Sequence, residues 1–175
     1  MSGSFHRRIR HADLATGPLT LRLAASAADR SGLAARFGLV AIARLDAEMT
    51  VTAAGDDILV SGSLHAEVTQ SCVRSLEPVT SEIVDSYRVR YVPAGRLAER
   101  EVEIDPEAEE DLDILEAEGV DLGELVAQSL SLALDPYPHR PSGACVDVTL
   151  WDEVGEAGER ATGPFAVLKN LRDKS

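Results

Sequence analysis

Aromatic residues are scarce in this 175-residue chain: they make up 4% of the sequence, whereas hydrophobic residues make up 45%. The core must therefore consist mainly of alanine, valine, leucine and isoleucine, and few rings are available to stack on nucleic-acid bases. No run approaches the roughly 18 apolar residues that cross a bilayer, and no signal-type apolar stretch follows the N-terminal arginines. We therefore expect a cytoplasmic protein that does not contact a membrane.

Cysteine is scarcer still, since Cys72 and Cys145 are the only two in the chain. Tetrahedral zinc needs four sulfur or imidazole ligands, and the two cysteines and four histidines have no ligand-type spacing. Cys72-Val73-Arg74-Ser75 is one sulfur short of a C-x-x-C motif. The sequence therefore predicts no metal, no cofactor and no catalytic residue, and it predicts that Cys72 is a structural thiol at a strand end. A thiol-dependent enzyme or redox sensor that uses Cys72 and Cys145 stays open as the alternative.

Charge is distributed unevenly along the chain, whose formal net charge is −13. Residues 1–44 carry a net +5 and residues 99–124 a net −12. Phosphate binding draws on clustered lysine and arginine, so the acidic balance argues against DNA as a partner. Residues 1–12 are predicted to be a basic N-terminal arm, either mobile or an ordered first strand. Its Arg7, Arg8 and Arg10 are the candidate contacts to RNA.

Periodicity predicts an α+β fold whose antiparallel sheet contains a long hairpin at residues 58–91. Residues 39–53 change parity once, which is typical of a strand with a bulge or of two short strands. Helices are predicted near residues 26–37, where Ser26 and Asp29 form a capping pair, and near residues 121–135, which Asp121 caps. A short C-terminal helix completes the set.

The length of the chain favours one domain over residues 1–175. Besides the arm, this domain would include an acidic linker at residues 99–118 and an irregular region at residues 141–163. Such acidic runs are usually solvated because like charges repel, and the spacing of an EF-hand loop is absent. The alternative for residues 99–118 is an acidic surface that docks a basic partner.

Two blocks of the sequence form a recognisable pattern. In the first block, a strand with Gly62-Ser63-Leu64 precedes the segment Cys72-Val73-Arg74-Ser75-Leu76-Glu77-Pro78. The second block is an acidic run, a leucine-rich helix and a proline-rich exit that ends near residue 138. Together the two blocks resemble the YceD family of bacterial and plastid proteins. The family's usual form of the first block is C-x-R-C-L-x-P, from which this chain departs at Ser75.

The resemblance implies a non-enzymatic ribosome-biogenesis factor that supports the synthesis, processing or accumulation of large-subunit (23S) ribosomal RNA. Its partner would be that RNA or its precursor particle, contacted directly or through a partner protein. Because Ser75 replaces the second cysteine, the resemblance is to a form of the family without the paired cysteines. Arg74, Glu77 and Pro78 at the hairpin tip are then the candidate binding residues. An adaptor for an unrelated protein partner is a further alternative.

Overall fold

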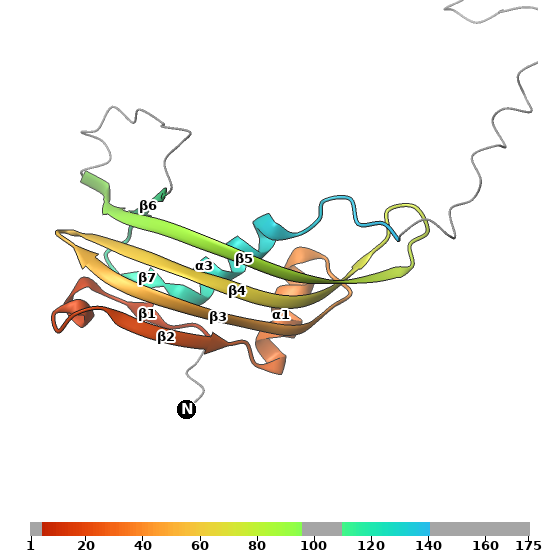
Figure 1. Ribbon diagram of the computed structural model, residues 1–175, viewed down its shortest axis with the longest axis horizontal. Coiled ribbons are helices and arrows are strands. Elements are labelled where there is room, and N and C mark those ends of the chain that lie inside the picture. The colour runs from red at the N-terminus through yellow and green to blue at the C-terminus, as the bar shows by residue number, and fades with distance from the viewer. Residues whose placement is uncertain (1–4, 96–109, 141–175) are drawn as a thin grey trace, which may run out of the picture. The chain divides into compact units, whose positions relative to one another are not determined.

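A five-stranded sheet with the strand order β2-β3-β4-β5-β6 organises the protein (Figure 1). The computed structural model describes residues 5–95 and 110–140. The strands of this sheet are β2 (Leu19–Ala24), β3 (Ala41–Ala54), β4 (Asp57–Ser71), β5 (Pro78–Pro93) and β6 (Asp111–Leu115). Neighbouring strands from β2 to β5 are antiparallel, whereas β6 runs parallel to β5. With the helices described below, this sheet confirms the predicted α+β class.

The hairpin of β4 and β5 is the longest pairing in the sheet, and it confirms the predicted hairpin at residues 58–91. Its register runs from Ile58 opposite Tyr91 to Ser71 opposite Pro78. Alternate side chains of β4, including Val60, Leu64 and Val68, are buried. This follows from the period of two in a strand, which sends every second side chain to the same face.

Strand β3 is continuous, and its register against β4 shifts between Ile42 and Arg44. Of the two alternatives for residues 39–53, a strand with a bulge is therefore the one observed, because a bulge changes which residues face the core. On the C-terminal side of the bulge, Leu45, Met49 and Val51 are buried.

Both predicted helices of the described part are present. Helix α1 (Ala27–Phe37) begins with a reciprocal cap: Ser26 Oγ accepts the N–H of Asp29, and the Asp29 carboxylate accepts the N–H of Ser26. It ends at Gly38, whose φ of 67° favours glycine. Helix α3 (Leu122–Ala133) begins at Asp121, whose carboxylate accepts two backbone N–H groups.

A second, two-stranded sheet joins the N-terminus to the start of α3. Strand β1 (Arg8–Ile9) pairs antiparallel with β7 (Val120–Asp121), and a short 3-10 helix η1 (His11–Leu14) follows β1. Of the two alternatives for the N-terminal arm, the ordered strand is therefore the one observed for its described part.

The core lies between one face of the large sheet and α3, which is seen behind β4 and β5 in Figure 1. Helix α3 supplies Leu122, Val126 and Leu130 to this core, all with 0% exposure. The opposite sheet face carries mostly hydroxyl and charged side chains. No helix within residues 5–95 and 110–140 is long and apolar enough to cross a membrane.

The acidic segment differs from the expected linker where the structure describes it. Residues 111–115 form β6 and pair with Val89–Pro93. Two features explain why this part of the acidic run forms a strand. Arg90 neutralises the charge of Glu110 through two hydrogen bonds, at 2.9 and 2.7 Å. The aspartates of β6 also alternate with apolar residues, as is typical of a strand. Residues 99–109, the irregular region at 141–163 and the expected C-terminal helix lie outside the described residues.

Candidate functional site

The N-terminal segment that contains β1 is held by buried residues that alternate with its arginines. Phe5 and Ile9 are 2% and 3% exposed, and the backbone oxygen of Arg7 accepts the N–H of Leu122 at 2.9 Å. Two glycines permit this close approach. A Cβ atom at Gly119 would lie 2.4 Å from the Ile9 oxygen, and one at Gly123 would lie 2.4 Å from the Phe5 oxygen. The strand is therefore fixed by packing, not by its charge.

Arg7, Arg8 and Arg10 line one hollow of about 870 Å³ beside β1, which we call the arginine hollow. Its wall also includes Asp13 and Glu118. Arg8 forms an ion pair with Glu118, whereas Arg7 and Arg10 form no ion pair with any residue in the described ranges. The structure thus brings the three predicted arginines together, and two of them have guanidinium groups available for an anion.

The hairpin tip is a tight loop closed by its own backbone. The N–H of Cys72 donates to the Glu77 oxygen at 2.8 Å, and the N–H of Leu76 donates to the Cys72 oxygen at 2.9 Å. Leu76 has a φ of 60°, a left-handed conformation that is unfavourable for a side chain other than glycine. The predicted contact residues Arg74, Glu77 and Pro78 are all exposed on this loop.

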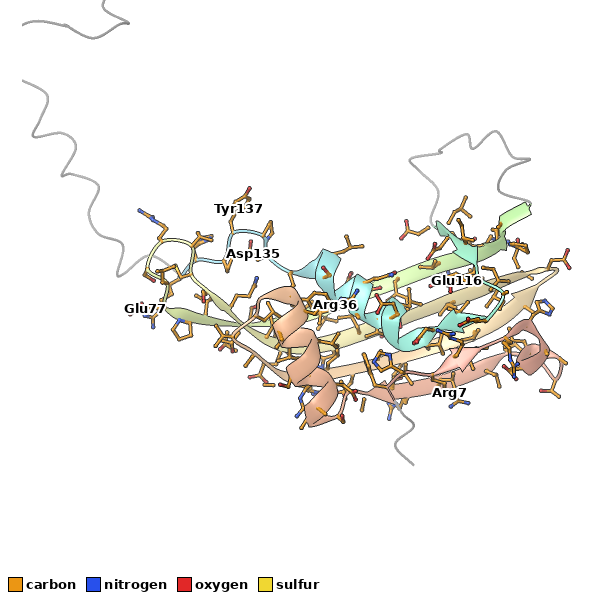
Figure 2. All side chains as sticks on the ribbon, turned by 180° about the vertical axis from the view of Figure 1, so that it is seen from behind. Arg7, Arg36, Glu77, Glu116, Asp135 and Tyr137 are labelled. Atoms are coloured by element: carbon orange, nitrogen blue, oxygen red, sulfur yellow. The ribbon has the colours of Figure 1, made fainter. Side chains whose placement is uncertain are left out.

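The segment after α3 packs against the hairpin tip, which sequence reasoning missed. The N–H of Val73 donates to the Pro138 oxygen, and the Gln70 side chain donates to the Asp135 oxygen, both at 2.9 Å. Arg140 completes the contact with a hydrogen bond of 2.5 Å to Glu77. Figure 2 accordingly shows Glu77, Asp135 and Tyr137 at the same end of the molecule. The only sequence signal for this contact was the proline-rich exit of the helix.

Three apolar side chains are exposed at this end, and they make the tip a surface that could contact a protein. They are Val73, Leu76 and Tyr137, with exposed fractions of 52%, 78% and 72%. Figure 2 shows Arg7 toward the other end of the sheet from Glu77. The predicted residues therefore form two separate surfaces, the arginine hollow and the hairpin tip.

Cys72 directly follows β4, and its side chain is buried. Hydrogen bonds lower the pKa of its thiol to about 6; the largest contribution comes from the Ser75 side chain, followed by backbone N–H groups of Ser75, Arg74 and Arg140. The N–H of Ser75 lies 3.5 Å from Sγ. Within the described ranges, no three histidine, cysteine or acidic residues are grouped as metal ligands would be.

One family model matches most of the chain. It is described as "Large ribosomal RNA subunit accumulation protein YceD", and the match covers residues 60–172. The matched span includes the hairpin tip and α3, whereas the arginine hollow draws on residues that precede it. No solved structure matches the chain.

Proposed function

The chain belongs to the YceD family, and from this membership we propose that it supports the accumulation of large-subunit ribosomal RNA in the cytoplasm. It would act as a non-enzymatic binding protein that holds the 23S RNA, its precursor particle or a partner protein on that particle. The proposal assigns no catalytic residue, metal or cofactor to the chain.

The single observation that supports an RNA contact is the arginine hollow. A net charge of −13 opposes binding to phosphate over most of the surface, so any contact needs a local concentration of positive charge. Arg7, Arg8 and Arg10 provide it from β1 and the residues that flank it, and the guanidinium groups of Arg7 and Arg10, which are not paired with Glu118 as Arg8 is, can each donate two parallel hydrogen bonds to a phosphate. We expect a small number of phosphate contacts and therefore weak, salt-sensitive binding.

The hairpin tip would bind the other proposed partner, a protein of the precursor particle. Exposed apolar groups next to an Arg–carboxylate pair are typical of a protein contact, in which buried anchors are surrounded by a polar rim. Leu76 and Tyr137 would be the anchors, with Arg74, Glu77 and Pro78 around them.

Deletion of the gene tests the cellular function. We expect the ratio of large-subunit to small-subunit ribosomal RNA to fall, and re-expression of the wild-type chain to restore it. An unchanged ratio in the deletion strain would contradict the proposed function as a whole.

A triple variant tests the arginine hollow. Arg7→Gln, Arg8→Gln and Arg10→Gln together should weaken association with precursor particles and flatten its dependence on salt, because fewer counterions are released. The control variant Arg22→Gln, Arg30→Gln and Arg44→Gln removes the same charge from other elements and should retain association. If the two triple variants associate equally well, the contact does not lie in the arginine hollow.

A further inference from the structure

Strand β5 has an open edge along more than half of its length. Of its 16 residues, 78–91 pair with β4 on one side, but β6 covers only Val89–Pro93 on the other. Among residues 5–95 and 110–140, no strand pairs with Val79–Arg88 on this outer side. In an antiparallel pair every second residue directs its N–H and C=O away from the partner strand. The edge therefore presents a row of backbone donors and acceptors ready for another strand.

One hydrogen bond indicates which residues present these groups. The N–H of Ser86 donates to the carboxylate of the adjacent Asp85 at 2.9 Å, which indicates that this N–H points away from β4. By alternation, the backbone groups of Val84 and Glu82 point the same way. The side chain of Val84 is 73% exposed, so neither its backbone nor its side chain is covered.

A hollow of about 520 Å³ lies beside this edge, between β5, the start of β6 and α3. We call it the edge hollow. The carboxylates of Asp85, Asp111 and Asp113 form its acidic wall and outnumber the one cation of its described lining, Arg88. Its apolar wall includes Leu125 and Leu132 of α3. A strand added to β5 would direct every second side chain to the face of the sheet where this hollow lies, and the others to the face of Val84.

Tyr87 is a residue of the edge hollow that carries an unsatisfied polar atom. It lines the hollow and is 9% exposed, and its hydroxyl is the buried side-chain polar atom in the described ranges that has no hydrogen-bond partner. Burial raises the pKa of this hydroxyl to about 12, so it stays protonated at neutral pH. A buried hydroxyl without a partner is unfavourable, and an incoming polar group would remove that cost.

We propose that the outer edge of β5 binds an extended basic segment of a partner protein, which adds to the sheet as a strand. Its lysine or arginine side chains would enter the edge hollow toward Asp85, Asp111 and Asp113, and apolar side chains would alternate with them beside Val84. Strand addition supplies affinity through the backbone, and the acidic wall selects the charge. The proposal goes beyond the proposed function, because it requires no contact with RNA.

Charge decides between this partner and a second copy of the chain. Two β5 edges placed side by side would bring Asp85 and Glu82 of both copies together, in a protein whose net charge is already −13. Like charges directly opposite each other on paired strands are destabilising. A basic segment instead gains from the same carboxylates.

The test uses the full-length protein and fluorescent peptides of equal length. The first alternates lysine with valine, the second alternates glutamate with valine, and the third alternates lysine with proline. We expect only the lysine–valine peptide to bind, because the second has the wrong charge and the third lacks half of the backbone N–H groups. Equal binding of the lysine–valine and lysine–proline peptides would overturn strand addition, since diffuse charge would then explain the affinity.

Variants locate the binding on the edge. Val84→Pro removes an outward N–H and should lower the affinity for the lysine–valine peptide by roughly tenfold or more. Val84→Thr keeps that N–H and should bind the peptide as the wild type does. Asp85→Asn, Asp111→Asn and Asp113→Asn together should weaken binding and reduce its salt dependence. Wild-type affinity in Val84→Pro would overturn the proposal.

Amide hydrogen exchange on the wild-type protein needs no variant and covers the case in which Val84→Pro does not fold. Saturating lysine–valine peptide should slow exchange at Glu82, Val84 and Ser86, and no change there would overturn the proposal. Slow exchange at Glu82 and Val84 before any peptide is added would mean that another part of this chain or a second copy already occupies the edge; Ser86 does not enter this comparison because its N–H already donates to Asp85. Either result overturns the assignment to a partner. Sedimentation of the free protein in an analytical ultracentrifuge would distinguish a monomer, whose own chain covers the edge, from a dimer. A retained ribosomal RNA ratio in the gene deletion leaves these outcomes unaffected, so the two proposals fail separately.

Discussion

Arg36 of α1 donates two hydrogen bonds to the carboxylate of Glu124 in the first turn of α3, at 2.8 and 2.7 Å. The two residues are 88 positions apart, so the pair joins segments that only the tertiary fold brings together. The Arg36 hydrogen bond is the largest cause that lowers the pKa of Glu124 below its ordinary value. Glu124 also lies at the N-terminus of its helix, where a negative charge is favourable.

We predict that Glu124→Gln lowers the free energy of unfolding modestly at neutral pH, because both side chains of the pair are partly exposed. A carboxyl group with a lowered folded-state pKa stabilises the protein above its unfolded-state pKa and loses that contribution as pH falls through the folded-state value. The difference between wild type and variant should therefore shrink in acid. Urea titrations at several pH values, with Arg36→Gln and the double variant, would measure it; a difference that does not depend on pH would contradict the ion pair.

Gly62 is predicted to be essential for the packing of the central strands. A Cβ atom at this position would lie 2.4 Å from the Glu48 oxygen and 2.8 Å from Met49 Cβ, both on β3. Gly62→Ala should therefore lower the free energy of unfolding by about 1–3 kcal/mol, as is usual for overpacking. The control Gly32→Ala, in α1 with no atom within 4 Å, should raise it by roughly 0.5–1 kcal/mol. Chemical denaturation of both variants would measure the difference, and equal effects would refute it.

The left-handed backbone of Leu76 predicts that glycine substitutions at two exposed leucines, Leu76 and Leu132, change the free energy of unfolding in opposite directions. Leu76→Gly should raise the free energy of unfolding by up to about 1 kcal/mol, because glycine adopts a φ of 60° without strain and the side chain is 78% exposed. Leu132→Gly, on the exposed side of α3, should lower it by roughly 0.5–1 kcal/mol. Thermal melts would compare them. A loss of stability in both variants would show that the Leu76 side chain contributes to packing at the tip.

Local signals in the sequence predicted the elements whose causes are local. Ser26 with Asp29 and Asp121 with the N–H of Glu124 are caps formed within three residues, and the hairpin follows from alternation on either side of one turn. The bulge in β3 was visible as a change of parity. Such features depend on neighbours along the chain, so a single sequence contains them.

Long-range packing explains what the sequence did not reveal. Strand β1 is ordered because Gly119 and Gly123, more than 100 positions away, let it approach α3. The acidic run was expected to be solvated, yet part of it pairs with β5 beside Arg90. Val84 belongs to a regular strand pattern but is exposed, because its side chain lies on the sheet face opposite the one that carries the buried Tyr87 and Val89. Of the candidate sites, clustering of three arginines was predictable from adjacency, whereas contact between the hairpin tip and Arg140 was not.

Gly123→Ala tests whether binding depends on where the arginines of the N-terminal arm lie or only on their charge. The new Cβ would lie 2.4 Å from the Phe5 oxygen, so the strand must move while every arginine is kept. We expect the amides of Arg8 and Ile9 to lose protection from hydrogen exchange, and association with precursor particles to weaken as it does in the triple arginine variant. Full association despite a displaced strand would show that charge alone, without the geometry of the arginine hollow, accounts for binding.

Cys72 should titrate as an acidic thiol. Its pKa is lowered to about 6 from an ordinary value of 9.0 by hydrogen bonds, of which the Ser75 side chain contributes most. In the Cys145→Ser variant, thiolate absorbance near 240 nm, corrected with the variant that lacks both cysteines, should therefore rise around pH 6, and Ser75→Ala should move the midpoint upward. Because the folded-state pKa lies below the unfolded-state pKa, the thiolate's contribution to stability should grow from pH 6 to pH 9 and vanish below pH 6. A midpoint near 9 in both proteins would refute this role of Ser75. Confirmation would show that the residue that replaces the second cysteine of the family's motif stabilises the charge of the first.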